Sequence, residues 1–205
     1  MEVPPEDLDE DEAYLKSLQE DKKNKKKLTE NPFSAGFLKH GPAYYEGMMW
    51  LSKSYIKRDK WLDAKYYLDK IVEDGFATDE VLSESHVVRA DMHIKMKDYN
   101  EALKSIDTAI ESNKDRRLRA RLTFIKGQIH QLKGNAAEAS EAFSDVDNYK
   151  PSFEMELHAK MNQLRNGWAA GTTTSDAAIR KLKRLANESK NEPYRGSIYL
   201  SLIHI

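Results

Sequence analysis

One apolar pattern occurs three times in phase along the chain. Each copy consists of an alanine, a large apolar residue four positions later and another apolar residue three positions further on. The alanines are Ala64, Ala102 and Ala139, so the copies lie 38 and 37 residues apart. Two antiparallel helices approach closely only where one presents a small side chain, and a large residue one turn later fills the adjacent groove. A single helix pair cannot bury such a face, so the pattern predicts a stack of helix pairs.

A further helix is expected before each copy, and turn and cap residues separate the two. In the first of these helices Met48, Leu51 and Tyr55 recur at helical spacing. Asp98 and Glu101 form a capping box at the start of a second helix, because each side chain can accept a hydrogen bond from a free backbone N–H of that turn. Asn135 with Glu138 is expected to form the same box, and Asp59 is expected to cap the second helix of the first unit. The preceding helices are expected at 43–57, 79–96 and 115–133.

A weaker fourth unit follows Pro151. Residues 152–166 and 175–189 are expected to be helices around a long polar turn, and Ala178 lies 39 residues after Ala139. The expected fold class is therefore all-α, a right-handed α-solenoid of stacked antiparallel helix pairs. The expected organisation is a charged, flexible leader at 1–41, repeats at 42–75, 78–113, 115–150 and 152–190, and a truncated start of a further helix at 193–205.

Composition excludes several classes of site. The 205 residues include no cysteine, which excludes disulfides, thiolate metal sites and cysteine nucleophiles. The formal net charge of -1 gives no overall bias towards nucleic acid. No apolar run reaches the roughly 18 residues of a membrane span, and the acidic N-terminus lacks the layout of a signal peptide. The chain as given is expected to be soluble, with no compartment indicated.

The leader contains two opposed charge blocks. Seven acidic residues lie in 2–12 and five lysines in 22–27. The blocks can pair with each other, or the segment can be a solvated arm. The lysines can also contact phosphate, but they lack arginine and interleaved aromatic residues. No nucleic-acid partner is expected.

These residues resemble the tetratricopeptide repeat, whose pattern runs W-x₂-L-G-x₂-Y, then A-x₃-F, then P. The third unit is the closest match, with Gly127 at the glycine position, His130 at the tyrosine position, then Phe143 and Pro151. In the second unit Arg89, Ala90 and His93 stand at the leucine, glycine and tyrosine positions. The full set of expected signature residues is Leu51, Tyr55, Ala64, Leu68, Ala90, Ala102, Ile106, Gly127, Ala139, Phe143 and Pro151.

The resemblance implies a non-catalytic scaffold that binds a protein or peptide in a concave groove lined by the first helix of each unit. Met49 and Val88 occupy the positions at which some family members clamp a C-terminal carboxylate, which argues against that ligand. The groove residues implied by alignment are Glu46, Met49, Lys53, Ile56, Glu84, Val87, Asp91, Ile94, Arg121, Phe124, Gln128 and Gln131.

Two further resemblances concern the origin of the chain. Segments 50–55, 119–124 and 187–192 are similar to the large multi-repeat lipoproteins of bacterial gliding motility and protein secretion, which implies a role at the bacterial periplasm or outer membrane. Residues 200–205 resemble the translation of a transposon end used in sequencing libraries. That resemblance implies a natural sequence ending at Tyr199 and a fragment of a larger protein; the alternative is a genuine apolar helix.

No catalytic residue, metal ligand or cofactor is expected. His86 and His93 are two turns apart on one helix face, about 10 Å, which is too far to share a metal ion. The sequence contains no phosphate-binding glycine loop, HExxH helix or GxSxG elbow. The arginine-rich run at 116–121 can bind an acidic partner segment or a phosphate, or it can form a solvated helix start. Of the remaining alternatives, an enzyme-associated helical domain would need a convergent polar cluster, and none is visible in the sequence. Nucleic-acid binding through residues 22–27 or 116–121 would predict an affinity that depends steeply on salt.

Overall fold

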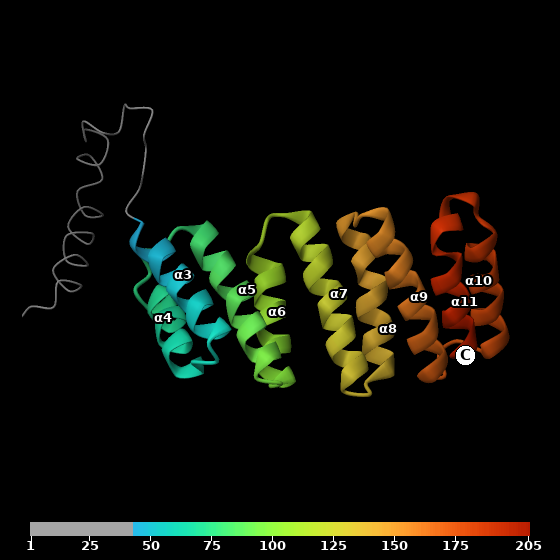
Figure 1. Cartoon of the computed structure of the whole chain (residues 1–205), viewed down its shortest axis with the longest axis horizontal. Coiled ribbons are helices and arrows are strands. Elements are labelled where there is room, and N and C mark those ends of the chain that lie inside the picture. The colour runs from blue at the N-terminus through green and yellow to red at the C-terminus, as the bar shows by residue number, and fades with distance from the viewer. Residues whose placement is uncertain (1–42) are drawn as a thin grey trace, which may run out of the picture.

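The computed structural model describes residues 43–205; the expected leader at 1–41 lies outside them. This part of the chain contains nine α-helices, two short 3₁₀ helices and no strand. Helices that are neighbours in sequence pack side by side along a single row (Figure 1). The fold is therefore all-α, an α-solenoid of adjacent helix pairs. The helices are α3 (Tyr44–Lys57), α4 (Trp61–Glu73), α5 (Asp79–Lys95), α6 (Tyr99–Ser112), α7 (Arg116–Leu132), α8 (Ala136–Asp145), η1 (Val146–Tyr149), α9 (Phe153–Ala169), α10 (Ser175–Asn187), η2 (Ser189–Tyr194) and α11 (Arg195–Ile203).

The recurring alanines lie in the buried interior of the helix pairs. Ala64, Ala102, Ala139 and Ala178 are all 0% exposed, and the large residues one turn later are also buried. Three small residues, Ser52, Ala90 and Gly127, lie twelve positions before the first three alanines, and all three are buried. The tightest contact is at Gly127, where an added Cβ would lie 2.8 Å from a ring carbon of Phe143. In the third pair, the large residue of the pattern, Phe143, thus packs against a small residue of the preceding helix.

The first helix buries a different stripe from the one expected. Leu51 is 38% exposed, whereas Ser52 is fully buried and donates a hydrogen bond to the carbonyl oxygen of Met48 at 2.8 Å. The face of α3 that packs against α4 and α5 is formed by residues at i, i+3, i+4 and i+7 spacing, which leaves Leu51 on the outer side. The buried residues of α3 are Tyr45, Met48, Met49, Ser52 and Ile56.

A left-handed residue recurs in the turn within each of the first three helix pairs. Asp59, Lys97 and Gly134 have φ values of 57°, 59° and 78°, and each lies five positions before the alanine of its unit. Asp59 is therefore part of the turn and does not cap α4, which begins at Trp61. The expectation of a cap at Asp59 was wrong because the turn geometry requires this position before the helix begins. Only in the third pair does glycine relieve the cost of that conformation.

The other expected caps have mixed outcomes. The Asp98 side chain accepts a hydrogen bond from the backbone N–H of Glu101 at 3.3 Å, so the cap on α6 is confirmed. The Glu101 carboxylate, which was expected to complete the box, instead accepts a hydrogen bond from Lys104 at 2.5 Å. Asn135 occupies the N-cap position of α8, but its side chain makes no capping hydrogen bond. There the backbone N–H of Ala139 bonds to the carbonyl oxygen of Asn135 at 2.9 Å.

Equivalent ion pairs join successive helix pairs. Arg89 on α5 contacts Asp69 on α4 at 2.6 Å, and Lys126 on α7 contacts Asp107 on α6 at 2.7 Å. The acidic residues lie 38 positions apart and the basic residues 37, so both pairs have the same place in the repeat. The two junctions between neighbouring helix pairs therefore use the same positions of the repeat.

The C-terminal part departs from this regular stacking. Helix α9 packs extensively against α8, and α10 packs against both α9 and α11. The close approach at this point involves Gly167, where an added Cβ would lie 3.0 Å from Thr173 Oγ1 and 3.2 Å from Ser140 Oγ. None of the helices in residues 43–205 combines the length and apolarity that crossing a membrane requires.

Candidate functional site

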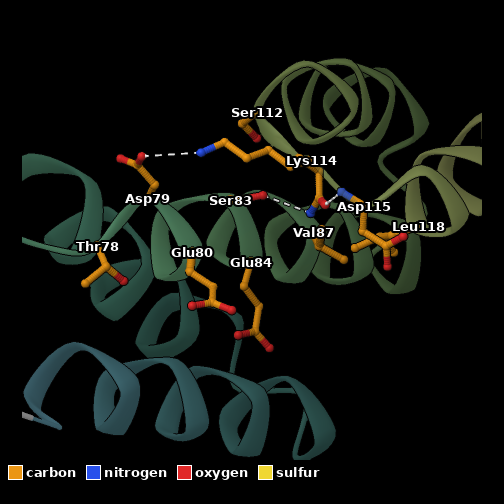
Figure 2. Close-up of a pocket in the computed structure, with 11 residues that line it drawn as sticks. Thr78, Asp79, Glu80, Ser83, Glu84, Val87, Ser112, Lys114, Asp115 and Leu118 are labelled. Carbon is orange, nitrogen blue, oxygen red and sulfur yellow. Dashed lines mark hydrogen bonds and ion pairs between the residues drawn. The ribbon is translucent and has the colours of Figure 1, made fainter. Parts of the chain in front are cut away.

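The first helices of the units, α3, α5, α7 and α9, contribute most of the lining of three hollows. The largest, the α5–α7 hollow, has a volume of about 730 Å³ (Figure 2). It lies between the start of α5 and the loop that leads into α7. Its lining residues are Thr78, Asp79, Glu80, Ser83, Glu84, Val87, Ser112, Asn113, Lys114, Asp115 and Leu118.

Two smaller hollows extend the same face. The α3–α5 hollow, of about 280 Å³, shares Thr78, Glu80 and Glu84 with the α5–α7 hollow, so the two are contiguous across α5. The α7–α9 hollow, of about 380 Å³, lies near the opposite ends of these helices. The α3–α5 hollow is further lined by Glu46, Met49, Trp50 and Val81, and the α7–α9 hollow by Ile94, Tyr99, Ile125, Gln128, Ile129, Gln131, Leu132, Asn162 and Arg165.

Seven of the twelve groove residues implied by the resemblance line these hollows. They are Glu46 and Met49 on α3, Glu84, Val87 and Ile94 on α5, and Gln128 and Gln131 on α7. Met49 offers little surface to a ligand, because it is only 2% exposed and belongs to the core.

The other five implied residues have different surroundings. Ile56 is 2% exposed and packs in the core of the first pair, so a partner cannot reach it. Phe124 is half-buried, with its ring edge against Phe143 at a centroid distance of 5.2 Å. Lys53 forms an ion pair with Glu84 and lies over the Trp50 ring. The two remaining residues, Asp91 and Arg121, are exposed, and Asp91 pairs with Lys95 at 3.0 Å.

The α5–α7 hollow also contains residues that the sequence reasoning missed. The loop residue Asn113 donates a hydrogen bond from Nδ2 to Ser83 Oγ at 2.8 Å and so fixes the loop against α5. Asp115 accepts a hydrogen bond from the backbone N–H of Arg117 at 2.8 Å and begins α7. These residues lie outside the helix positions that carry the repeat pattern. In the sequence, these residues were indicated only by an acidic or polar loop immediately before a first helix.

The contiguous pair of hollows is acidic. Glu80 and Glu84 are one turn apart on α5 and project in the same direction (Figure 2). Glu46, Asp79 and Asp115 also line the two hollows, and Asp79 points towards Lys114, away from the two glutamates (Figure 2). The lysine of this lining, Lys114, reaches Asp79 only at 3.9 Å, with both side chains at least 90% exposed. This part of the face therefore favours a cationic ligand.

Three histidines have pKa values below the usual value, chiefly because burial disfavours the charged ring. The pKa of His86 is lowered by burial and by Arg89, and burial also dominates the lowered pKa of His93 and of His130. The Nδ1 atoms of His93 and His130 are buried and make no hydrogen bond within residues 43–205. Both side chains are partly buried near the C-terminal ends of α5 and α7.

The four arginines at the start of α7 differ in their surroundings. Arg119 is partly buried and its guanidinium lies 4.5 Å from the centre of the Tyr149 ring. Arg116, Arg117 and Arg121 are exposed. One arginine of the run thus packs against η1, and three remain available at the surface. Across residues 43–205, no group of three histidine, aspartate or glutamate side chains is placed to hold a metal ion.

Residues 83–116 match the family model of the tetratricopeptide repeat. The match covers most of α5, all of α6 and the first residue of α7, and it includes Ala90, Ala102 and Ile106. This segment is therefore similar to a tetratricopeptide repeat, in agreement with the sequence pattern. No curated protein matches the chain.

Proposed function

We propose that this chain is a non-catalytic scaffold that binds a protein or peptide along the face formed by α3, α5, α7 and α9. The observation that carries the proposal is the run of hollows on that one face, in an array that contains a segment similar to a tetratricopeptide repeat. Tetratricopeptide repeats belong to the stacked repeat architectures whose extended concave surfaces serve for binding. The domain limits of the sequence analysis, with repeats at 42–75, 78–113, 115–150 and 152–190, are part of this proposal.

The lining supports a protein ligand over a small molecule. The hollows are partly open to solvent, and they mix apolar side chains such as Val87, Leu118 and Ile125 with carboxylates and amides. Small-molecule sites bury most of their ligand in a predominantly apolar cavity, whereas an extended peptide needs alternating apolar and polar subsites. The spacing of the hollows across successive helices suits a segment that runs across the row.

An enzyme is a weaker candidate on the same observations. The titratable groups with shifted pKa values are histidines at helix packing positions and ion-paired residues such as Asp69 and Lys160. An active site would bring such groups together in a cleft with a nucleophile or a proton acceptor. The groove residues implied by the alignment instead include charged, amide and apolar side chains along the row of first helices.

Matched variants test the proposed binding face. Gln128→Glu combined with Arg121→Glu changes two exposed positions of α7 on the proposed face or next to it, whereas Lys104→Glu combined with Thr108→Glu makes the same change of net charge at two exposed positions of α6. A partner captured by the intact chain should be lost by the first variant and retained by the second, with circular dichroism showing both folded. Equal capture by both variants would contradict the proposed face.

A second candidate, a component of a bacterial secretion or gliding machinery, rests on the similarity of segments 50–55, 119–124 and 187–192 to multi-repeat lipoproteins. The complete reading frame tests it. A lipidation signal and further repeats upstream would support the envelope role, and a reading frame with neither would contradict it.

A further inference from the structure

The acidic surface formed by the α3–α5 and α5–α7 hollows has an excess of carboxylates over cations. Glu80 and Glu84 repel each other because like charges one helical turn apart are unfavourable. Lys53 pairs with Glu84, but neither Glu46 nor Glu80 has an ion-pair partner among residues 43–205. A ligand that brings several positive charges would relieve this repulsion.

The same surface has an apolar floor. Val87 and Leu118 line the α5–α7 hollow, and Trp50 and Val81 line the α3–α5 hollow. A ligand that fits both features carries a run of cations next to an apolar side chain, long enough to extend from α3 across α5 to α7.

The chain itself contains such a segment. Residues 22–27 contain five lysines, and Leu28 follows directly. Segment 22–28 therefore has the charge that the carboxylates require and an apolar side chain for the floor. Its sequence is also complementary to the acidic block at 2–12, which is the competing intramolecular occupant.

The length of chain between this segment and α3 is sufficient. Fifteen residues separate Lys27 from Ala43, which immediately precedes α3, and they can span up to about 50 Å when extended. Packed helices lie about 8–10 Å apart, so the α5–α7 hollow is within about two helix spacings, roughly 20 Å, of α3. A flexible linker of such a length would give an effective concentration on the order of millimolar.

We propose that the acidic surface of the α3–α5 and α5–α7 hollows binds the lysine-rich segment 22–28 of the same chain. The segment occupies part of the face assigned above to a partner, so the inference rests on that face being a binding surface. A partner that uses this part of the face must displace the segment, whereas the α7–α9 hollow stays open. The two ends of the face thus differ in accessibility.

A spin label tests the proposal in the full chain. Because the chain has no cysteine, Asn24→Cys provides a single labelling site within the lysine run. Paramagnetic broadening of backbone amide signals should then be strongest around Glu80, Glu84 and Asn113, and absent from α10 and α11. The broadening should disappear in high salt, because exposed charges are screened.

Two double variants that each remove two negative charges distinguish binding at the acidic surface from attraction by the net charge of the whole protein. Glu80→Gln with Glu84→Gln should abolish the broadening around α5. Glu138→Gln with Glu141→Gln, two exposed positions on α8, should leave it unchanged. Replacing the lysines of 22–27 by glutamine should also abolish it.

Broadening that is absent, uniform, or equally strong in both charge variants would overturn the proposal. Broadening confined to amides of 2–12 would assign the lysines to the acidic block and overturn it as well. The measurement uses no partner, so its failure leaves the proposed scaffold function to be judged by the capture experiment.

Discussion

The contact between Gly127 and Phe143 makes the repeat packing open to a quantitative test by Gly127→Ala. The new Cβ would lie 2.8, 2.9 and 3.0 Å from three carbons of the Phe143 ring, well inside the 3.5–4.0 Å of a favourable carbon contact. Overpacking of this kind costs about 1–3 kcal/mol. Alanine also gains about 1 kcal/mol over glycine in a helix interior, so the net loss of unfolding free energy should be about 0–2 kcal/mol.

Gly47→Ala is the matched control for this variant. Gly47 lies in α3, and nothing lies within 4 Å of an added Cβ there. The helix-propensity gain is common to both variants, so their unfolding free energies should differ by about 1–3 kcal/mol, the overpacking cost alone. Urea unfolding followed by circular dichroism measures this difference.

A compensating change makes the test specific to the Phe143 ring. Phe143→Leu introduces the residue found at the equivalent position of the first unit, Leu68, and removes the ring carbons that the new Cβ would meet. The double variant should therefore lose less unfolding free energy than the two single variants lose in sum. Contacting residues are coupled by about 0.5–3 kcal/mol. A Gly127→Ala protein as stable as Gly47→Ala would refute the close approach of α7 and α8.

The remaining predictions concern pH, the inter-unit ion pairs and the turns. The lowered pKa values of His93 and His130 mean that the unfolded state binds more protons, so stability should be full above about pH 7 and fall as the pH drops below about 6.5. Melting temperatures between about pH 7.5 and 5.5 check this, and glutamine at both positions should weaken the dependence and leave the part due to His86, whose pKa is also lowered by burial. Asp69→Asn and Asp107→Asn should each lower the unfolding free energy by about 0.2–1 kcal/mol, additively, because the two pairs lie at different junctions. Gly134→Ala should cost about 1 kcal/mol through its φ of 78° alone, as nothing lies within 4 Å of the new Cβ; an unchanged unfolding midpoint would contradict this.

The helix pairs could be predicted from the sequence because their determinants are local and repeated. The helix expected at 79–96 is observed as Asp79–Lys95, and the one expected at 115–133 as Arg116–Leu132. Alanine and a large residue at fixed spacing determine the close approach, and a cap such as Asp98 marks the boundary. Both signals depend on residues a few positions apart, which a single sequence shows directly.

The turns could not be predicted in the same way. The left-handed position is occupied by Asp59, Lys97 and Gly134 in successive units, and only glycine is a recognisable signal for that conformation. At Asp59 the side chain suggested a helix cap, and the backbone geometry of the turn determined the outcome. The first helix was misjudged for a related reason, since the burial of Ser52 in place of Leu51 depends on which neighbours α3 meets.

The candidate site could be predicted only in part. Alignment of first-helix positions found Glu84, Val87 and Gln128, because every first helix presents equivalent positions to the same face. It could not find Asn113 or Asp115, because the loops do not follow the repeat. Two of the aligned positions, Met49 and Ile56, lie in the core. The alignment could not show this, because the way α3 packs against α5 depends on tertiary contacts.

Site-specific photo-crosslinking tests the central claim that the face formed by α3, α5, α7 and α9 binds the partner. A photoreactive residue at Gln128 lies in the α7–α9 hollow, and one at Lys104 lies at an exposed position of α6 outside all the hollows described. The account predicts a covalent adduct with one partner protein from position 128 and none from position 104. Adducts with the same partner from position 104 alone would contradict it.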